Sequence, residues 1–452
     1  MASFRKFNKF SFLFSCILSF FSVNAVAQKS EIIHPEWSKN ATIYEVNLRQ
    51  FTNEGTFKAF EKHLPNLKNM GVDIIWFMPI HPIGELNRKG TLGSYYSVKD
   101  YKAVNPEFGT LDEFKDLVNK IHEMGMYVII DWVANHTSWD NEWTKTNPDF
   151  YSKDSLGNFY APVPDWHDVI DLNYENNEMR SAMIDALKFW VSECNIDGYR
   201  CDVAAMVPTE FWNESRQELD KIKKVFMLAE ASETYLHEKA FDMTYNWQLK
   251  DIMNEIAKGK KNVNALDKRL KKEKQEYHPD AYRMNFTTNH DENTWNGTVF
   301  ERLGNGAEAF MVLAATIEGM PLIYSGQEAG LNKRLDFFEK DTIEWKRHRF
   351  YDVIKKIFDL KKNNEALWNG ISGGELVRIK TNDDKSIFAF IRQKNNNKVF
   401  ALFNLSPNSV TVKINSDLIN DKFKDLFNES EKEILSQYTA EMPGWSYKVF
   451  YK

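Results

Sequence analysis

Short apolar segments alternate with amphipathic segments along most of this chain, from about residue 40 onward. Residues 73–79 are apolar at almost every position, as expected of a strand that is buried on both faces. Residues 56–70 and 110–124 instead carry apolar side chains at helical spacing, and Gly71 and Gly125 mark the ends of these two predicted helices. By the same reasoning, strands are predicted at residues 43–47, 73–79, 127–131, 198–203, 225–230, 241–243, 283–289 and 322–324. Strands that each lead into a helix predict an α/β fold, and eight of them predict a closed (β/α)8 TIM barrel.

Two regions depart from this alternation. Residues 136–173 follow the third predicted strand and are rich in Trp, Asp, Asn and Pro. Because a loop of this length is usually functional, we interpret it as a short inserted domain. From residue 366, strand-like runs between turn-rich segments replace the helices, which predicts a C-terminal antiparallel β-sandwich over residues 366–452. The catalytic barrel is then expected over residues 28–365.

The N-terminus has the pattern of a secretory signal peptide. Basic residues precede an apolar run at residues 10–21, and an Ala-x-Ala pattern ends at Ala27. The apolar run is too short for a membrane span, so we expect cleavage after Ala27 and a periplasmic or secreted protein. A lipoprotein that uses Cys16 is the alternative, with a shorter apolar segment before the cysteine.

Composition argues against some classes of partner and does not decide whether the cysteines form a disulfide. The formal net charge is −6, with acidic and basic residues interspersed, which argues against nucleic acid as a partner. No other stretch is apolar enough to span a membrane. After loss of the signal, Cys194 and Cys201 remain as a disulfide or as free thiols, and no Cys/His cluster has zinc spacing.

Charged residues gather where the predicted strands end. Asp131 ends the third strand, Arg200 and Asp202 share one face of the fourth, and Glu230 ends the fifth. Asp291 follows the seventh strand. An Arg-x-Asp pair alone is nearly as often a structural ion pair, but the active site of a (β/α)8 barrel lies at these strand ends. Several carboxylates there predict a functional cavity.

Carboxylates without a zinc cluster or a phosphate-binding glycine loop favour glycoside chemistry. That chemistry needs one protonated carboxylic acid for the leaving oxygen and one ionised carboxylate. Arg200 should keep Asp202 ionised, whereas Glu230 lies on an apolar strand near other carboxylates and is the better acid.

Five short motifs in this chain resemble those of the α-amylase family, family 13 of the glycoside hydrolases. The resemblance covers nearly all of the mature chain. The motifs are residues 131–136 (DWVANH), 198–202 (GYRCD), 229–230 (AE), 289–291 (NHD) and, in the inserted domain, 169–173 (VIDLN).

The resemblance implies catalytic roles for four residues. Asp202 would be the nucleophile that forms a covalent glucosyl-enzyme, and Glu230 the general acid and then the base. Asp291 would bind sugar hydroxyls and stabilise the transition state. Arg200 would orient Asp202. In a retaining enzyme of this kind the acid and nucleophile carboxyls should lie about 5–5.5 Å apart.

The resemblance also implies binding residues. Tyr96 would stack on the sugar in the cleaved subsite, and His136 and His290 would hydrogen-bond it. Many family members bind calcium between the barrel and the inserted domain, and Asn135 and Asp171 stand at the matching positions for Ca2+, a cation that prefers oxygen ligands. Asp131 is expected to support the barrel wall rather than to act in catalysis.

The sequence departs from the usual family pattern after the nucleophile. Val203 follows Asp202 where many α-amylases have Ala, and the Lys-His pair that touches sugar in the leaving-group subsites is missing. We therefore expect a retaining glycoside hydrolase that cleaves α-1,4 bonds, with α-1,6 bonds as a further candidate, in starch-derived glucans or maltooligosaccharides. The alternatives are a transglycosylase or trehalose-forming isomerase on the same scaffold, and a non-catalytic sugar-binding relative.

Overall fold

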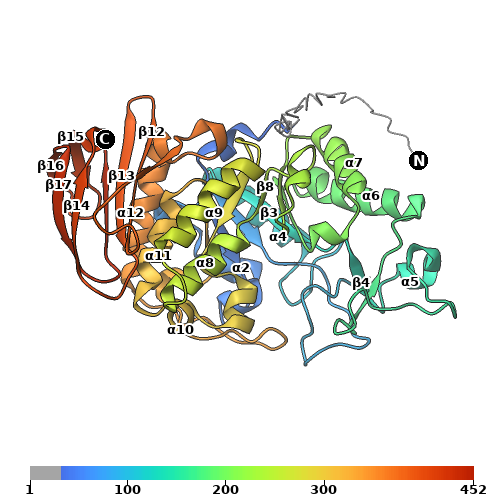
Figure 1. Ribbon diagram of the computed structural model, residues 1–452. Helices are drawn as coiled ribbons and strands as arrows, with labels where there is room; N and C mark the ends of the chain where they lie inside the picture. The colour runs from blue at the N-terminus through green and yellow to red at the C-terminus, as the bar shows by residue number, and fades with distance from the viewer. Residues whose placement is uncertain (1–31) are drawn as a thin grey trace, which may run out of the picture.

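The computed structural model describes residues 32–452 (Figure 1). The predicted signal peptide, residues 1–27, lies outside these described residues. Within residues 32–452, no helix combines the length and the apolar character that a membrane crossing needs.

A closed barrel of parallel strands forms the centre of the molecule. Its strands run in the order β1-β10-β9-β8-β7-β6-β3-β2, and the ladder closes between β1 and β2. Their bounds are β1 (Ile43–Val46), β2 (Ile74–Phe77), β3 (Tyr127–Trp132), β6 (Gly198–Cys201), β7 (Phe226–Ala229), β8 (Met243–Tyr245), β9 (Tyr282–Asn285) and β10 (Met320–Tyr324). The predicted (β/α)8 barrel is confirmed.

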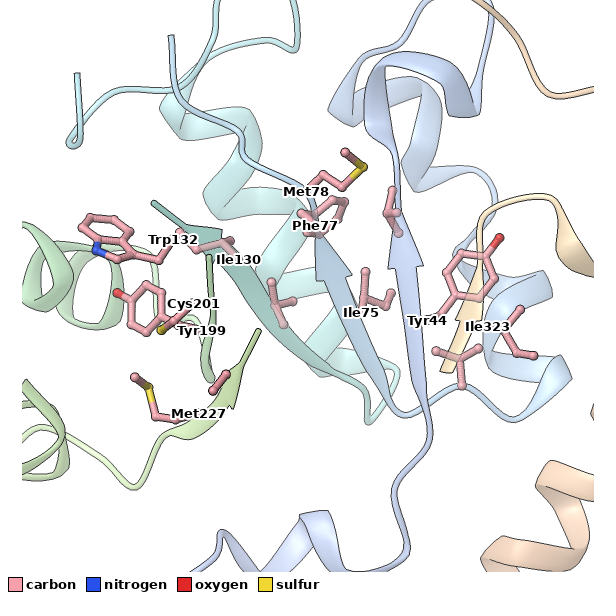
Figure 2. Close-up of a cluster of buried hydrophobic side chains, with 14 of the residues drawn as sticks. Tyr44, Ile75, Phe77, Met78, Ile130, Trp132, Tyr199, Cys201, Met227 and Ile323 are labelled. Atoms are coloured by element: carbon pink, nitrogen blue, oxygen red, sulfur yellow. The ribbon is translucent and has the colours of Figure 1, made fainter. Parts of the chain in front are cut away.

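Each barrel strand buries both of its faces, which explains its near-continuous apolar sequence. In β2, Ile74 and Trp76 point into the barrel interior, where they pack with apolar side chains from the other strands. Ile75 and Phe77 point outward to the helix layer. Figure 2 shows this outer layer, in which Ile75 and Phe77 lie among side chains of the neighbouring strands.

Helices cover the outside of the barrel, and their ends carry recognisable caps. In α4, Thr110 and Glu113 form a reciprocal capping box, and in α6 the side chain of Asn176 accepts from two backbone amides. The helices are α1 (Leu48–Phe51), α2 (Phe57–Glu61), α3 (Leu64–Met70), α4 (Leu111–Glu123), α5 (Trp143–Thr146), α6 (Asn177–Glu193), α7 (Thr209–Asp220), α8 (Trp247–Ala257), α9 (Val263–Glu276), α10 (Val299–Leu303), α11 (Ala307–Thr316) and α12 (Arg349–Asn363).

Three predicted elements differ from the observed ones. The helix expected over 56–70 is broken between α2 and α3, because Pro65 has no N–H to donate into a continuous helix. The sixth strand is Met243–Tyr245 rather than residues 241–243, and the side chain of Asp242 just before it accepts from Arg216 and from the amide of Met227. The seventh strand ends at Asn285, and residues 286–289 continue as a loop towards the cavity described below.

The segment after β3 carries a small antiparallel pair. Strand β4 (His136–Ser138) pairs with β5 (Val169–Asp171), so that His136 lies opposite Asp171. This pair and α5 project from one side of the barrel, away from the C-terminal strands (Figure 1). The long connection thus returns to the barrel rim beside the strand end that it left.

The C-terminal region forms the expected antiparallel sheets. A six-stranded sheet has the order β11-β12-β13-β18-β15-β16, and β14 pairs with β17. The central strands of this sheet, β12 and β13, are buried on both faces: Phe400 and Leu402 pack with Val412 of β14, whereas Phe388 and Phe403 join the core that continues into the barrel helices. The strands are β11 (Leu376–Ile379), β12 (Ile387–Lys394), β13 (Asn397–Asn404), β14 (Val410–Asn415), β15 (Asp421–Asp425), β16 (Glu431–Ile434), β17 (Gln437–Met442) and β18 (Tyr447–Tyr451).

The two cysteines of the described chain are both free and buried. Cys201 points outward from β6 into the layer that contains Tyr199 and Trp132 (Figure 2). The disulfide that the sequence left open is therefore not formed, and both residues act as small apolar side chains.

Candidate active site

A cavity of about 280 Å³ opens at the C-terminal ends of the barrel strands. It contains the three carboxylates predicted to be catalytic and three of the predicted binding side chains. Its lining residues are Lys89, Ser94, Tyr96, His136, Trp166, Asp168, Val169, Asp202, Val203, Glu230, His290, Asp291, Trp295, Phe337 and Phe338. Elements far apart in the sequence, from β2 to β10, thus contribute to one site.

Arg200 lies beneath this cavity and is completely buried. Its Nη1 donates to Asp131 Oδ1 and to Asp202 Oδ1, each at 2.9 Å, and its Nη2 lies 3.1 Å from Glu230 Oε2. Its Nε donates to the hydroxyl of Tyr245 at 3.1 Å. A single guanidinium therefore holds three carboxylates at the base of the cavity, which offsets part of the cost of burying their charges.

The surroundings of the Glu230 carboxyl shift it towards its protonated form. Burial raises its pKa to about 7; Arg200 opposes this shift, whereas the negative charges of Asp202 and Asp291 add to it. The backbone N–H of Val203 donates to Glu230 Oε2 at 2.8 Å and fixes the orientation of the carboxyl. Val203 adopts φ +37°, a left-handed conformation that is strained for a β-branched residue.

Asp202 loses its proton more readily than Glu230. Burial raises its pKa to about 6, while Arg200 acts in the opposite direction and Asp131 raises the pKa further. Of the two coupled carboxyls, Asp202 therefore has the lower pKa and ionises first as the pH rises. The two carboxyls therefore divide into a negative group and an acid, as the sequence predicts.

His290 links two further acidic side chains. Its Nδ1 donates to Glu45 Oε1 at 2.5 Å, and its Nε2 lies 2.9 Å from the Tyr96 hydroxyl and 3.2 Å from Asp291 Oδ2. Burial alone would lower the pKa of His290, but the charges of Asp291 and Glu45 raise it well above its usual value. Burial would raise the pKa of Asp291, but His290 holds it below its usual value.

Tyr96 extends this network to the arginine. Its hydroxyl donates to Asp131 Oδ2 at 3.1 Å, and its ring stacks on Phe337 with an angle of 10° between the planes. Asp131 is fully buried and touches Arg200 rather than the cavity. A continuous chain of polar contacts therefore runs from Glu45 through Tyr96 to Arg200.

His136 differs from His290 in its charge. Burial lowers its pKa to about 4, so its imidazole is neutral at physiological pH. It lines the cavity beside Trp166, with the ring centroids 5.5 Å apart. A neutral imidazole and a half-buried indole suit a polar, uncharged ligand with apolar faces, such as a sugar ring.

Taken together, the arrangement provides an ionised carboxylate, a protonated acid and a third carboxylate around one cavity. These are the groups that cleavage of a glycosidic bond requires. The sequence matches the protein-family model "Alpha amylase, catalytic domain" over residues 33–169 and 153–366. It matches the family model "Maltogenic Amylase, C-terminal domain" over residues 377–449.

This chain belongs to the α-amylase family of glycoside hydrolases.

Solved structures of this family resemble the whole described fold. A noncanonic maltogenic alpha-amylase AmyB from Thermotoga neapolitana superposes with a TM-score of 0.84 at 30% identity, over 92% of this chain and 99% of that one. An alpha-amylase from Lactobacillus plantarum gives 0.82 at 29% identity, over the same shares of the two chains. Alpha-amylase 3 of Dictyoglomus thermophilum is 26% identical over 89% of this chain and 93% of its own length.

Family membership makes this protein an enzyme that acts on O-glycosidic bonds. A non-catalytic sugar-binding relative is therefore not supported. The transglycosylase alternative is not favoured either, because these relatives are named as amylases.

The structure places Asn135 and Asp171, the two residues that the resemblance assigns to calcium, close together. Their backbones are neighbours through the pairing of His136 with Asp171, and Asn135 Nδ2 lies 3.2 Å from His136 Nδ1. Calcium takes about six to eight oxygen ligands. In residues 32–452 no three His, Cys, Asp or Glu side chains are grouped closely enough to hold a metal. Calcium binding in this amylase-family enzyme stays a prediction of the sequence resemblance.

Several residues of the site were not predicted. Glu45 stands in a predicted strand, and its charge in an otherwise apolar segment was a signal that it contacts the site. Lys89 and Asp168, by contrast, lie in loops without strand or helix periodicity, and no sequence pattern places them side by side. The aromatic lining residues Trp166, Phe337 and Phe338 were missed for the same reason, and Trp295 lies in a short π-helical turn (Glu292–Asn296) that no sequence pattern predicted.

Proposed function

We propose that this α-amylase-family enzyme hydrolyses α-glucosidic bonds in starch-derived glucans or maltooligosaccharides, with retention of configuration. The bonds are α-1,4, with α-1,6 as a further candidate. The names of its relatives support this substrate class: they include a maltogenic alpha-amylase from Bacillus acidopullulyticus, 25% identical over 95% of this chain and 80% of its own length. The site adds a cavity with sugar-compatible aromatic faces and three carboxylates.

In the first step, Asp202 attacks the anomeric carbon while Glu230 gives its proton to the glycosidic oxygen. The bond between that carbon and the leaving oxygen breaks, and a covalent glucosyl-enzyme forms. Arg200 orients Asp202 through the 2.9 Å hydrogen bond, and the Val203 amide orients Glu230. The leaving chain departs with a new hydroxyl group.

In the second step, the ionised Glu230 takes a proton from water, which attacks the same carbon and releases Asp202. Asp291 also lines the cavity, and His290 keeps its carboxyl ionised. Asp291 accepts hydrogen bonds from sugar hydroxyls and stabilises the positive charge of the transition state. Neutral His136 and charged His290 hydrogen-bond the same sugar, and Tyr96 stacks on it.

The observation that carries this proposal is the placement of Asp202, Glu230 and Asp291 around one cavity, with Asp202 and Glu230 both in contact with the Arg200 guanidinium. A slow fluorinated glucosyl fluoride should leave one fluoroglucosyl group on the enzyme, measured by intact-mass spectrometry and located on Asp202 by peptide mapping. Asp202→Ala should remain unlabelled and lose at least about 10³-fold in kcat. Label on another residue, or full activity of the variant, would sink the assignment.

We also propose that the enzyme is exported and cleaved after Ala27, because its first residues have the charge and apolar pattern of a signal peptide. Mass spectrometry of the periplasmic and culture fractions should show a mature chain beginning at Gln28. A lipid-modified chain beginning at Cys16 would support the lipoprotein alternative instead.

A further inference from the structure

Lys89 joins three loops at one end of the cavity. Its Nζ forms an ion pair with Asp168 Oδ1 at 2.9 Å, donates to the backbone oxygen of Asp165 at 2.8 Å, and lies 6.0 Å from the centroid of the Phe338 ring. Lys89, Asp168 and Phe338 all line the cavity. We call residues 88–94, 165–168 and 337–339, which meet here, the end wall.

Backbone and side-chain contacts join two segments of the end wall, residues 88–94 and 337–339, without the lysine. Arg49, itself buried, donates to the backbone oxygens of Gly93 and Phe337. The amide of Leu92 donates to the oxygen of Phe338 at 3.1 Å. Gly90 has φ +63°, and a Cβ there would lie 2.6 Å from Cβ of Phe338, so only glycine permits this approach. The loops after β1, β2 and β10 therefore form one fixed surface.

The barrel order shows which end of the cavity this wall closes. Glu230 follows β7, which lies diametrically opposite β1 in the closed sheet, whereas β2 and β10 are the two neighbours of β1. The sugar chain that Glu230 protonates leaves on the Glu230 side. The end wall therefore faces the glycone, the part of the substrate that becomes attached to Asp202.

The Lys89–Asp168 pair has the chemistry to recognise the end of a sugar chain. The Asp168 side chain is 6% exposed and that of Lys89 is 22% exposed, so the pair is more shielded than an ordinary surface ion pair. A carboxylate accepts hydrogen bonds from hydroxyl groups, and an ammonium group donates to them. A cavity of about 280 Å³ is small among ligand sites, which hold roughly 300–1,000 Å³.

We propose that Lys89 and Asp168 close the glycone end of the cavity, so that the enzyme acts from the non-reducing end and releases glucose or maltose units. This inference rests on the proposed hydrolysis of α-glucans and adds the end of the sugar chain from which hydrolysis begins. The terminal sugar stops at the end wall, where Asp168 and Lys89 hydrogen-bond its free hydroxyl groups.

The test compares two heptasaccharide substrates, each labelled with 2-aminopyridine at the reducing end. One is maltoheptaose; the other carries a 4,6-O-ethylidene group on its non-reducing sugar. The wild-type enzyme should degrade the blocked substrate at least about 100-fold more slowly, because the closed pocket rejects the added group. The first labelled products from the open substrate should be shorter by one or two units.

In Lys89→Ala the ratio of the two rates should fall to less than about tenfold, because the wall opens beside Asp168. Lys153→Ala is the matched control: Lys153 also pairs with an aspartate in the same inserted region and lies near a phenylalanine ring, but it does not line the cavity. This control should keep the wild-type ratio. Thermal unfolding of each variant checks its fold.

Equal wild-type rates on both substrates, or mid-length first products, would overturn the closed end while leaving the proposed hydrolysis intact. An unchanged ratio in a folded Lys89→Ala variant would overturn the part played by this pair. If neither substrate is degraded, the proposed function itself fails, and with it this inference.

Discussion

Asp131 and Asp202 accept hydrogen bonds from the same nitrogen of Arg200, each at 2.9 Å. The guanidinium charge that keeps Asp202 ionised is therefore shared with a second buried carboxylate. Burial raises the pKa of Asp131 to about 6, with Arg200 acting against it. The residue at the barrel wall thus affects the protonation of the proposed nucleophile without touching the substrate.

Replacing Asp131 by Asn should move the acidic limb of the pH–rate profile to lower pH. Loss of the Asp131 negative charge removes one cause of the raised pKa of Asp202. The Arg200 guanidinium is then no longer shared with a second carboxylate, so it stabilises ionised Asp202 more strongly. We also expect kcat to fall by about 10–100-fold, since the Tyr96 hydroxyl loses a charged acceptor. Asp112→Asn, at the exposed start of α4, is the control. An acidic limb that stays in place would contradict the coupling.

The wild-type enzyme should show a narrow bell-shaped dependence of kcat/KM on pH. Activity falls below about pH 6, where Asp202 takes up a proton, and above about pH 7, where Glu230 loses one. The two apparent values belong to the coupled pair. With maltosyl fluoride, whose leaving group needs no protonation, the alkaline limb should disappear. A profile that stays flat through pH 8 on maltooligosaccharides would contradict the role of Glu230.

Val203→Gly should raise stability and lower activity together. The left-handed backbone at Val203 costs about 1 kcal/mol or more for a β-branched residue and little for glycine. The thermal midpoint should therefore rise, while kcat falls by about tenfold because the amide that orients Glu230 is less well fixed. Val410→Gly, in strand β14, should instead destabilise by about 0.5–1 kcal/mol. A lower thermal unfolding midpoint for Val203→Gly would contradict the proposed backbone strain at Val203.

Calcium binding is tested by removing the metal. Dialysis against EDTA should lower the thermal midpoint, and added Ca2+ should restore it, because a ligand that binds only the folded state stabilises that state. Asp171→Ala should abolish the response, since it removes one of the two oxygen-bearing side chains implied by the resemblance. A midpoint insensitive to EDTA in the wild-type enzyme would remove calcium from the description of this protein.

The sequence predicts the barrel well because its strands are buried on both faces, and it locates Asp202 and Glu230 at the cavity because they directly follow β6 and β7. Arg200 lies on β6 and Asp202 directly follows it, with its amide still donating to the backbone oxygen of Trp132, so their shared orientation follows from the strand period. Lys89 and Asp168 lie 79 positions apart in two loops, and only tertiary packing makes them partners. The break before Pro65 was readable from the residue itself, and the prediction of one helix over 56–70 was wrong.

The end wall also affects how this enzyme handles a long polymer. A cavity closed behind the terminal sugar has a single mouth, so substrate, water and both products pass through the Glu230 side. After each cleavage the remaining polymer must leave first. Only then can water enter to hydrolyse the glucosyl-enzyme and the short product leave. Because no chain can thread past Lys89, successive cuts require separate encounters, and we expect digestion to be distributive rather than processive.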